Sequence, residues 1–116
     1  MKTKIILTSL SIFLTVAAFA QSKIVTDTIK VYGNCTMCKK RIEAALDQTG
    51  IKKAEWSPKT KNLVVVYNSD KISELQIHEL VAKVGHDTDK VKAKDEVYAT
   101  LPFCCLYRDH EGMGPH

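Results

Sequence analysis

The order in which strand-like and helix-like segments alternate between residues 26 and 93 constrains the fold more than any other feature. Residues 26–32 (TDTIKVY) alternate polar and apolar side chains, which is typical of a half-buried strand. Residues 36–48 are rich in helix-forming residues, and Gly50 follows as a helix stop. Residues 51–57 and 63–68 then read as two strands joined by the polar turn PKTKN, which predicts a β-hairpin.

A second helix is predicted after the hairpin. Ser73 and Gln76 form the pattern of a capping box, helically spaced apolar residues follow, and Gly85 ends the segment. Residues 87–93 (DTDKVKA) are a short candidate for a fourth strand. This βαββαβ order predicts an α+β fold of the split βαβ type, with one antiparallel sheet and both helices on one face.

The first twenty residues predict a cleaved secretory signal peptide. A positive start (Lys2, Lys4) precedes an apolar stretch, and Ala18-Phe19-Ala20 supplies the small residues of a cleavage site. We expect cleavage after Ala20, a periplasmic or secreted location and no membrane association afterwards; the alternative is an uncleaved N-terminal anchor. We further expect one small domain over residues 21–93 and a cysteine-containing C-terminal extension over residues 94–116.

Charge adds little to this picture. The net charge of +4 includes two lysines of the predicted signal peptide, so the remaining chain is only mildly basic. No segment resembles a nucleic-acid-binding module. There is also no Ser/His/Asp set, catalytic carboxylate pair or phosphate-binding loop in the sequence, and we do not expect an enzyme.

Four cysteines follow the predicted signal peptide: Cys35, Cys38, Cys104 and Cys105. Their spacing suits structural disulfides poorly, because the first pair closes a very short loop and the second a strained ring of adjacent residues. Clustered thiols of this kind indicate metal ligands or a redox centre.

Cys35 and Cys38 lie where the first helix is expected to begin. Free N–H groups and the helix dipole stabilise a thiolate there, and the basic run from Lys39 to Arg41 adds positive charge. Two thiolates suit a soft ion of low coordination number, for which Cu(I) is the first candidate. A structural zinc site usually needs four ligands.

The same C-x-x-C motif also serves thioredoxin-like thiol–disulfide oxidoreductases, which are the alternative. Against that alternative, a β-hairpin follows the first helix, and the motif lacks both an adjacent tryptophan and an intervening proline. An exported metal-sensing interaction module is a third possibility.

Residues 26–93 resemble the heavy-metal-associated domain of copper chaperones, copper-pump N-terminal domains and mercury-binding periplasmic proteins. The resemblance rests on VYGNCTMC, KKRIEAAL, the glycine before the hairpin, LVVVY and ELVAKVGHD. It implies a ferredoxin-like fold and a protein that carries or buffers a heavy metal by thiolate ligand exchange. The implied cargo is Cu(I), with Zn(II), Cd(II) and Hg(II) as alternatives. The implied partner is a metal-transporting ATPase, an efflux component or another metal-binding protein.

The sequence departs from this family in the metal loop. Tyr32-Gly33-Asn34 stands where the family usually has Gly-Met-Thr, so a glycine replaces the methionine that packs beneath the loop. The resemblance also places His86 facing the loop. It would be a third ligand or a hydrogen-bond partner of a thiolate, or else a loop residue without a role.

The C-terminal extension offers further candidates. Apolar residues predict that it packs as far as about Tyr107, and Cys104 and Cys105 would then add one or two thiolates to the site; the alternative is a pair that only helps the tail to pack. His110, Met113 and His116 are also copper-ligand types, or simply part of a terminus. We expect Trp56 in the core of the hairpin and His78 on the surface of the second helix.

Overall fold

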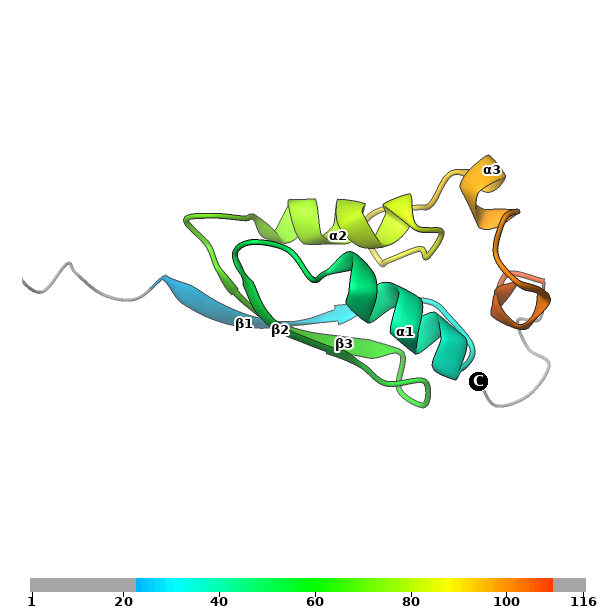
Figure 1. Cartoon of the computed structure of the whole chain (residues 1–116), viewed down its shortest axis with the longest axis horizontal. Coiled ribbons are helices and arrows are strands. Elements are labelled where there is room, and N and C mark those ends of the chain that lie inside the picture. Colours follow the sequence, from blue (N-terminus) through cyan, green and yellow to red (C-terminus); the bar gives the residue numbers. More distant parts are fainter. Residues whose placement is uncertain (1–22, 110–116) are drawn as a thin grey trace, which may run out of the picture.

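The computed structural model describes residues 23–109 and shows three antiparallel strands covered on one face by two helices (Figure 1). The strand order is β1-β3-β2, so the hairpin strand β3 lies at the centre. A short helix and a 3₁₀ turn follow in the extension. The elements are β1 Ile24–Lys30, α1 Thr36–Ala45, β2 Ile51–Trp56, β3 Asn62–Asn68, α2 Glu74–Lys83, α3 Asp95–Tyr98 and η2 Phe103–Cys105.

The alternation in the strands places the core. Leu63, Val65 and Tyr67 of β3 face the helices and are buried, whereas Val64 between them is exposed. Each of these buried residues lies opposite one residue of β1 and one of β2. Leu63, for example, pairs with Ile29 of β1 and with Trp56 of β2. The α+β fold predicted from the sequence is confirmed.

Helix α2 begins as predicted. The Ser73 hydroxyl accepts a hydrogen bond from the Gln76 N–H at 3.1 Å, and the Gln76 side chain accepts one from the Ser73 N–H at 2.8 Å. The expectation for His78 was wrong, because this side chain is only 1 % exposed. Its Nδ1 lies 2.6 Å from the Thr88 hydroxyl. The segment after α2 therefore covers the face of α2 that carries His78, which the sequence pattern placed at the surface.

The candidate fourth strand is reduced to a single bridge between Val31 and Thr88. The Thr88 hydroxyl accepts hydrogen bonds from the N–H groups of Lys90 and Val91 at 3.1 and 2.9 Å, and the Thr88 N–H donates to the Val91 carbonyl at 2.8 Å. These bonds close a turn that directs the chain away from the sheet edge. Within residues 23–109 the sheet therefore has three strands.

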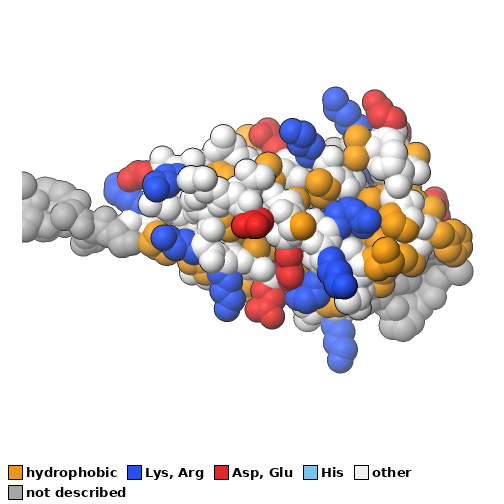
Figure 2. Space-filling view, viewed as in Figure 1, with side chains coloured by type: hydrophobic (Ala, Val, Ile, Leu, Met, Phe, Trp, Pro, Cys, Tyr) orange, Lys and Arg blue, Asp and Glu red, His pale blue; other side chains and the backbone are white. Residues whose placement is uncertain are grey.

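The C-terminal extension packs at the end of the domain where α1 begins (Figure 1). Tyr98, Leu101 and Tyr107 are buried, as the apolar pattern predicted, and so is Cys105, whereas Phe103 of the same pattern is 74 % exposed. Figure 2 shows hydrophobic side chains gathered at this end of the molecule, with Lys and Arg side chains beside them. No helix in the described part of the chain is long and apolar enough to span a membrane.

Candidate metal centre

Three cysteine sulfurs gather at the N-terminus of α1. Cys35 is the N-cap residue with extended backbone, and Cys38 lies in the first turn and is fully buried. Their sulfurs are 3.8 Å apart, and the sulfur of Cys105, which comes from η2, lies 4.0 Å from that of Cys35. All three ligand atoms lie within 4.8 Å of one another, and all are free thiols.

The surroundings of Cys35 favour its thiolate. Burial alone would raise the pKa of Cys35, but the backbone N–H groups of Cys38 and Met37 in the first helical turn outweigh it, and the pKa lies below its ordinary value. The Asn34 N–H donates to the Cys38 sulfur at 3.3 Å. Lys61, from the turn between β2 and β3, places a further positive charge near both sulfurs.

Cys105 is in a different environment. It is fully buried, and this burial raises the pKa of its thiol, as does the neighbouring Cys38. Arg41 opposes the effect, because its guanidinium donates to the Cys105 sulfur at 3.3 Å. The buried thiol of the extension is therefore paired with a cationic group of α1.

Arg108 and Asp87 attach the extension to the domain. The Arg108 guanidinium donates to both carboxylate oxygens of Asp87, at 2.7 and 3.1 Å, and to the Ala93 carbonyl at 2.8 Å. It also lies 4.3 Å from the centre of the Tyr98 ring. Burial would raise the pKa of Asp87, but the hydrogen bonds from Arg108 and the Ala93 N–H hold it below its ordinary value. We call the Arg108–Asp87 pair the clamp.

Tyr107 adds a second attachment, and it explains where His86 lies. The Tyr107 hydroxyl donates to the Gly85 carbonyl at 2.7 Å and accepts from the Asp87 N–H at 2.8 Å, and its ring stacks on His86 with centroids 5.3 Å apart. His86 is fully buried, and its Nδ1 lies 2.8 Å from the Tyr32 carbonyl. The structure does not include His86 in the group of three sulfurs.

Cys104 lies beside this group without belonging to it. Its exposed sulfur lies 3.4 Å from the Met37 sulfur and 4.0 Å from that of Cys105. Its carbonyl accepts a hydrogen bond from the Asn34 side-chain amide at 3.1 Å. Two adjacent cysteines therefore face different surroundings.

The glycine in the metal loop fits against a tryptophan. A Cβ atom at Gly33 would lie 3.1 Å from the Cys38 Cβ and 3.1 Å from the Trp56 indole. Trp56 is fully buried, as predicted, and its Nε1 donates to the Val31 carbonyl at 2.9 Å. The indole thus supports the loop from beneath, and a larger side chain at position 33 would need Trp56 or Cys38 to shift.

The basic run has divided roles. Lys39 donates to Glu43 at 2.7 Å and to the Trp56 carbonyl at 2.9 Å, so it connects α1 to β2. Arg41 faces Cys105, and Lys40 is exposed. Sequence reasoning missed Lys61, because only the hairpin geometry brings this turn residue to the sulfurs. His110, Met113 and His116, like the predicted signal peptide, lie outside the described residues.

Comparison with known proteins agrees with this geometry. The model of the heavy-metal-associated domain family matches residues 29–87, which include the C-x-x-C loop and both main helices. The chain belongs to the heavy-metal-associated domain family. No curated protein sequence matches it significantly.

Solved structures of heavy-metal-associated proteins share the fold. A CopZ metallochaperone aligns with a TM-score of 0.53 at 24 % identity, covering 55 % of this chain and 98 % of the other. A copper-binding domain of the P-type ATPase HMA7 aligns with a TM-score of 0.54 at 25 % identity, covering 60 % and 96 %. The Cu(I)-loaded N-terminal domain of a potential copper-translocating P-type ATPase from Bacillus subtilis gives 0.53 at 25 %, covering 62 % and 92 %.

Membership of this family supports a heavy-metal-binding module. These structures are covered almost completely by just over half of the present chain. The matched residues end at position 87, before Cys105. The third sulfur therefore comes from a part of the chain that the family match does not include.

Proposed function

We propose that this protein is an exported carrier or buffer of a soft metal ion, most favourably Cu(I), which binds to Cys35, Cys38 and Cys105. The observation that carries the proposal is the spacing of the three sulfurs. Two of the sulfur–sulfur distances are 3.8 and 4.0 Å, and the third is at most 4.8 Å. A point equidistant from all three sulfurs therefore lies about 2.3–2.5 Å from each, close to the length of about 2.3 Å that a zinc–thiolate bond has.

The number and type of ligands favour Cu(I) over Zn(II). Soft thiolates select Cu(I), and Zn(II) in structural sites takes four ligands. The described residues bring no fourth Cys, His, Asp or Glu into the group. The relatives described as copper-binding and as Cu(I)-loaded support the same choice. Hg(II), Cd(II) and Zn(II) remain as competing ions for the test.

Transfer would proceed by exchange of thiolate ligands. Cys35 is partly exposed and lies at the surface end of the group, so a partner thiolate can approach the ion from that side. The partner would displace one protein sulfur after another, and the ion would not be released into water. A metal-transporting ATPase, an efflux component or another metal-binding protein is the proposed partner, since relatives of the first kind share the fold.

Export is a separate part of the proposal and rests on the signal-peptide pattern of residues 1–20. It predicts that the protein recovered from its compartment begins at Gln21. N-terminal sequencing of the protein from separated periplasmic, secreted and cytoplasmic fractions tests this. An intact Met1 in the cytoplasmic fraction would contradict it.

The binding test is an anaerobic Cu(I) titration against a chromophoric chelator, with a phosphine reductant to keep the thiols reduced. Cys35→Ser combined with Cys38→Ser should abolish tight binding, and Cys104→Ser should retain one tightly bound ion. If the double variant binds that ion as tightly as the unchanged protein, the proposed site is wrong. Parallel titrations with Zn(II), Cd(II) and Hg(II) rank the metals. Reduction of a model disulfide by the thiols, without tight metal binding, would favour the oxidoreductase alternative.

A further inference from the structure

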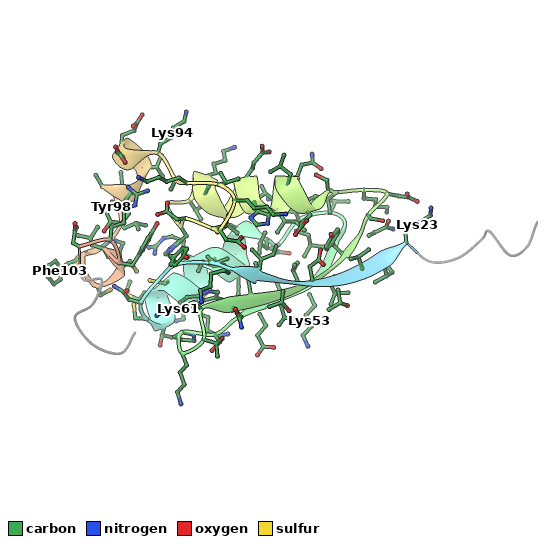
Figure 3. All side chains as sticks on the ribbon, turned by 180° about the vertical axis from the view of Figure 1, so that it is seen from behind. Lys23, Lys53, Lys61, Lys94, Tyr98 and Phe103 are labelled. Carbon is green, nitrogen blue, oxygen red and sulfur yellow. The ribbon has the colours of Figure 1, made fainter. Side chains whose placement is uncertain are left out.

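Five sulfur atoms form a continuous series that runs from Met37 to Cys38. The Met37 sulfur is 3.4 Å from that of Cys104, which is 4.0 Å from that of Cys105. The series continues from Cys105 to Cys35 over 4.0 Å and from Cys35 to Cys38 over 3.8 Å. The proposed carrier site uses only the inner three. Phe103, labelled in Figure 3, marks the end of the molecule at which the outer two lie.

We propose that Met37 and Cys104 form a second site for a soft monovalent ion, and that this site shares Cys105 with the first. This inference rests on the proposed function, because the shared thiolate belongs to the carrier site. A thioether and two thiolates are soft ligands that suit Cu(I) or Ag(I). A thiolate sulfur has lone pairs enough to bridge two ions. The Cys104 sulfur lies 3.4 Å from that of Met37 and 4.0 Å from that of Cys105, so it has a possible co-ligand on either side.

Two independent elements hold the outer site in place. Met37 lies in the first turn of α1, and its side chain is 48 % exposed although it is large and apolar. Cys104 lies in η2, where its carbonyl accepts a hydrogen bond from the Asn34 amide at 3.1 Å. The Cys35 thiol also approaches that carbonyl, at 3.6 Å. The loop that carries the inner thiols therefore also orients Cys104 toward Met37.

Cys104 and Cys105 differ in burial, and this difference suits a pair of sites that share the Cys105 sulfur. Cys105 is fully buried and faces both groups, and Cys104 is exposed and faces only the outer one. An ion in the outer site would be open to solvent and partners. It would reach the inner site through Cys105, which contacts both. The outer site thus adds a second exposed position, besides Cys35, at which a partner can reach an ion.

Native mass spectrometry of the purified, reduced protein during Ag(I) titration tests the proposal. The unchanged protein should bind two ions, with the second held more weakly. Met37→Leu and Cys104→Ser should each bind one, and because both side chains are at the surface, circular dichroism should show an unchanged fold. A control with His110→Ala, Met113→Leu and His116→Ala combined should still bind two.

Each outcome of this experiment decides the question. One bound ion in the unchanged protein, or two in the Met37→Leu/Cys104→Ser double variant, overturns the second site but leaves the carrier site intact. Loss of the second ion in the terminal control assigns that ion to the C-terminus and also overturns the proposal. If the unchanged protein binds no ion at all, the proposed function itself is overturned. A Cu–Cu vector in the X-ray absorption spectrum of the protein with two Cu(I) ions is the expected sign of the shared thiolate.

Discussion

Replacing Arg108 with Gln should weaken metal binding although Arg108 touches no sulfur. The clamp holds the extension in the position that brings Cys105 to Cys35 and Cys38. Arg108→Gln removes both bonds to the Asp87 carboxylate, whose side chain is 17 % exposed, while that of Arg108 is 21 % exposed. Breaking a fully buried ion pair costs about 3–5 kcal/mol, and the partial exposure here reduces the estimate to about 2 kcal/mol.

This free energy acts on docking of the extension. A loss of about 2 kcal/mol lowers the ratio of docked to undocked extension about thirtyfold. Affinity for the first Cu(I) ion should fall by up to the same factor. It should not fall further than in Cys105→Ser, where the third thiolate is absent altogether. Competition with a chromophoric chelator under reducing conditions measures both affinities.

The decisive comparison is a double-mutant cycle. If Arg108 acts through Cys105, adding Arg108→Gln to Cys105→Ser should have no further effect on affinity. Lys90→Gln serves as a control for the loss of a charge, since the Lys90–Glu74 pair is 3.4 Å long with side chains 54 % and 40 % exposed. Equal losses from Arg108→Gln in both backgrounds would refute the reasoning.

Three further predictions concern other parts of the site. Burial lowers the pKa of His86 to about 4, and the positive charge of Arg41 lowers it as well. The Tyr32 carbonyl and Asp87 act in the opposite direction but do not outweigh burial. Below pH 6.5 the unfolded chain therefore binds more protons than the folded one, and the free energy of unfolding of the metal-free protein should fall by about 3 kcal/mol between pH 6.5 and 4. Urea unfolding should show a smaller fall in His86→Phe. An identical fall in that variant would contradict the assignment to His86. Gly33→Ala should lower the free energy of unfolding by about 1–3 kcal/mol, because the new Cβ atom meets the indole of Trp56. In thermal or urea unfolding the loss should be smaller in a Trp56→Phe background. Equal losses in both backgrounds would exclude the indole as the cause. Cys105→Ser should speed Cu(I) transfer to a chelator about tenfold, a change of about 1.4 kcal/mol, in stopped-flow absorbance, and an unchanged rate would show that Cys105 does not limit release.

Local patterns in the sequence predicted most of the fold. The period of β3, the capping box at Ser73 and the hairpin turn each specify their element through neighbours in the chain, and the structure confirms them. The fourth strand failed for an equally local reason. The Thr88 hydroxyl closes a turn at the point where a strand would continue. The pattern of apolar residues does not show that this turn competes with the strand.

The surroundings of the sulfurs depend on contacts distant in the chain. Cys104 and Cys105 are adjacent and chemically identical, and nothing in the sequence indicates that one is buried and the other exposed. That difference follows from packing of the extension against α1, about seventy positions away, and from the clamp at Asp87. The burial of His78 and the stacking of His86 on Tyr107 have the same origin, because both depend on chain that follows α2.

A third thiolate supplied by the protein itself changes what the proposed carrier does best. In ligand exchange, the partner's first thiolate enters the coordination position that Cys105 would already occupy. A tethered ligand competes at an effective concentration in the millimolar range or above, which exceeds that of a dilute partner. The ion therefore leaves only when a partner either displaces Cys105 or draws the extension away from α1. A two-cysteine loop without the extension lacks this barrier. Within the proposed function, the extension favours retention over rapid delivery, so buffering, with release to a partner that engages the extension, is the role to which the docked Cys105 is best suited.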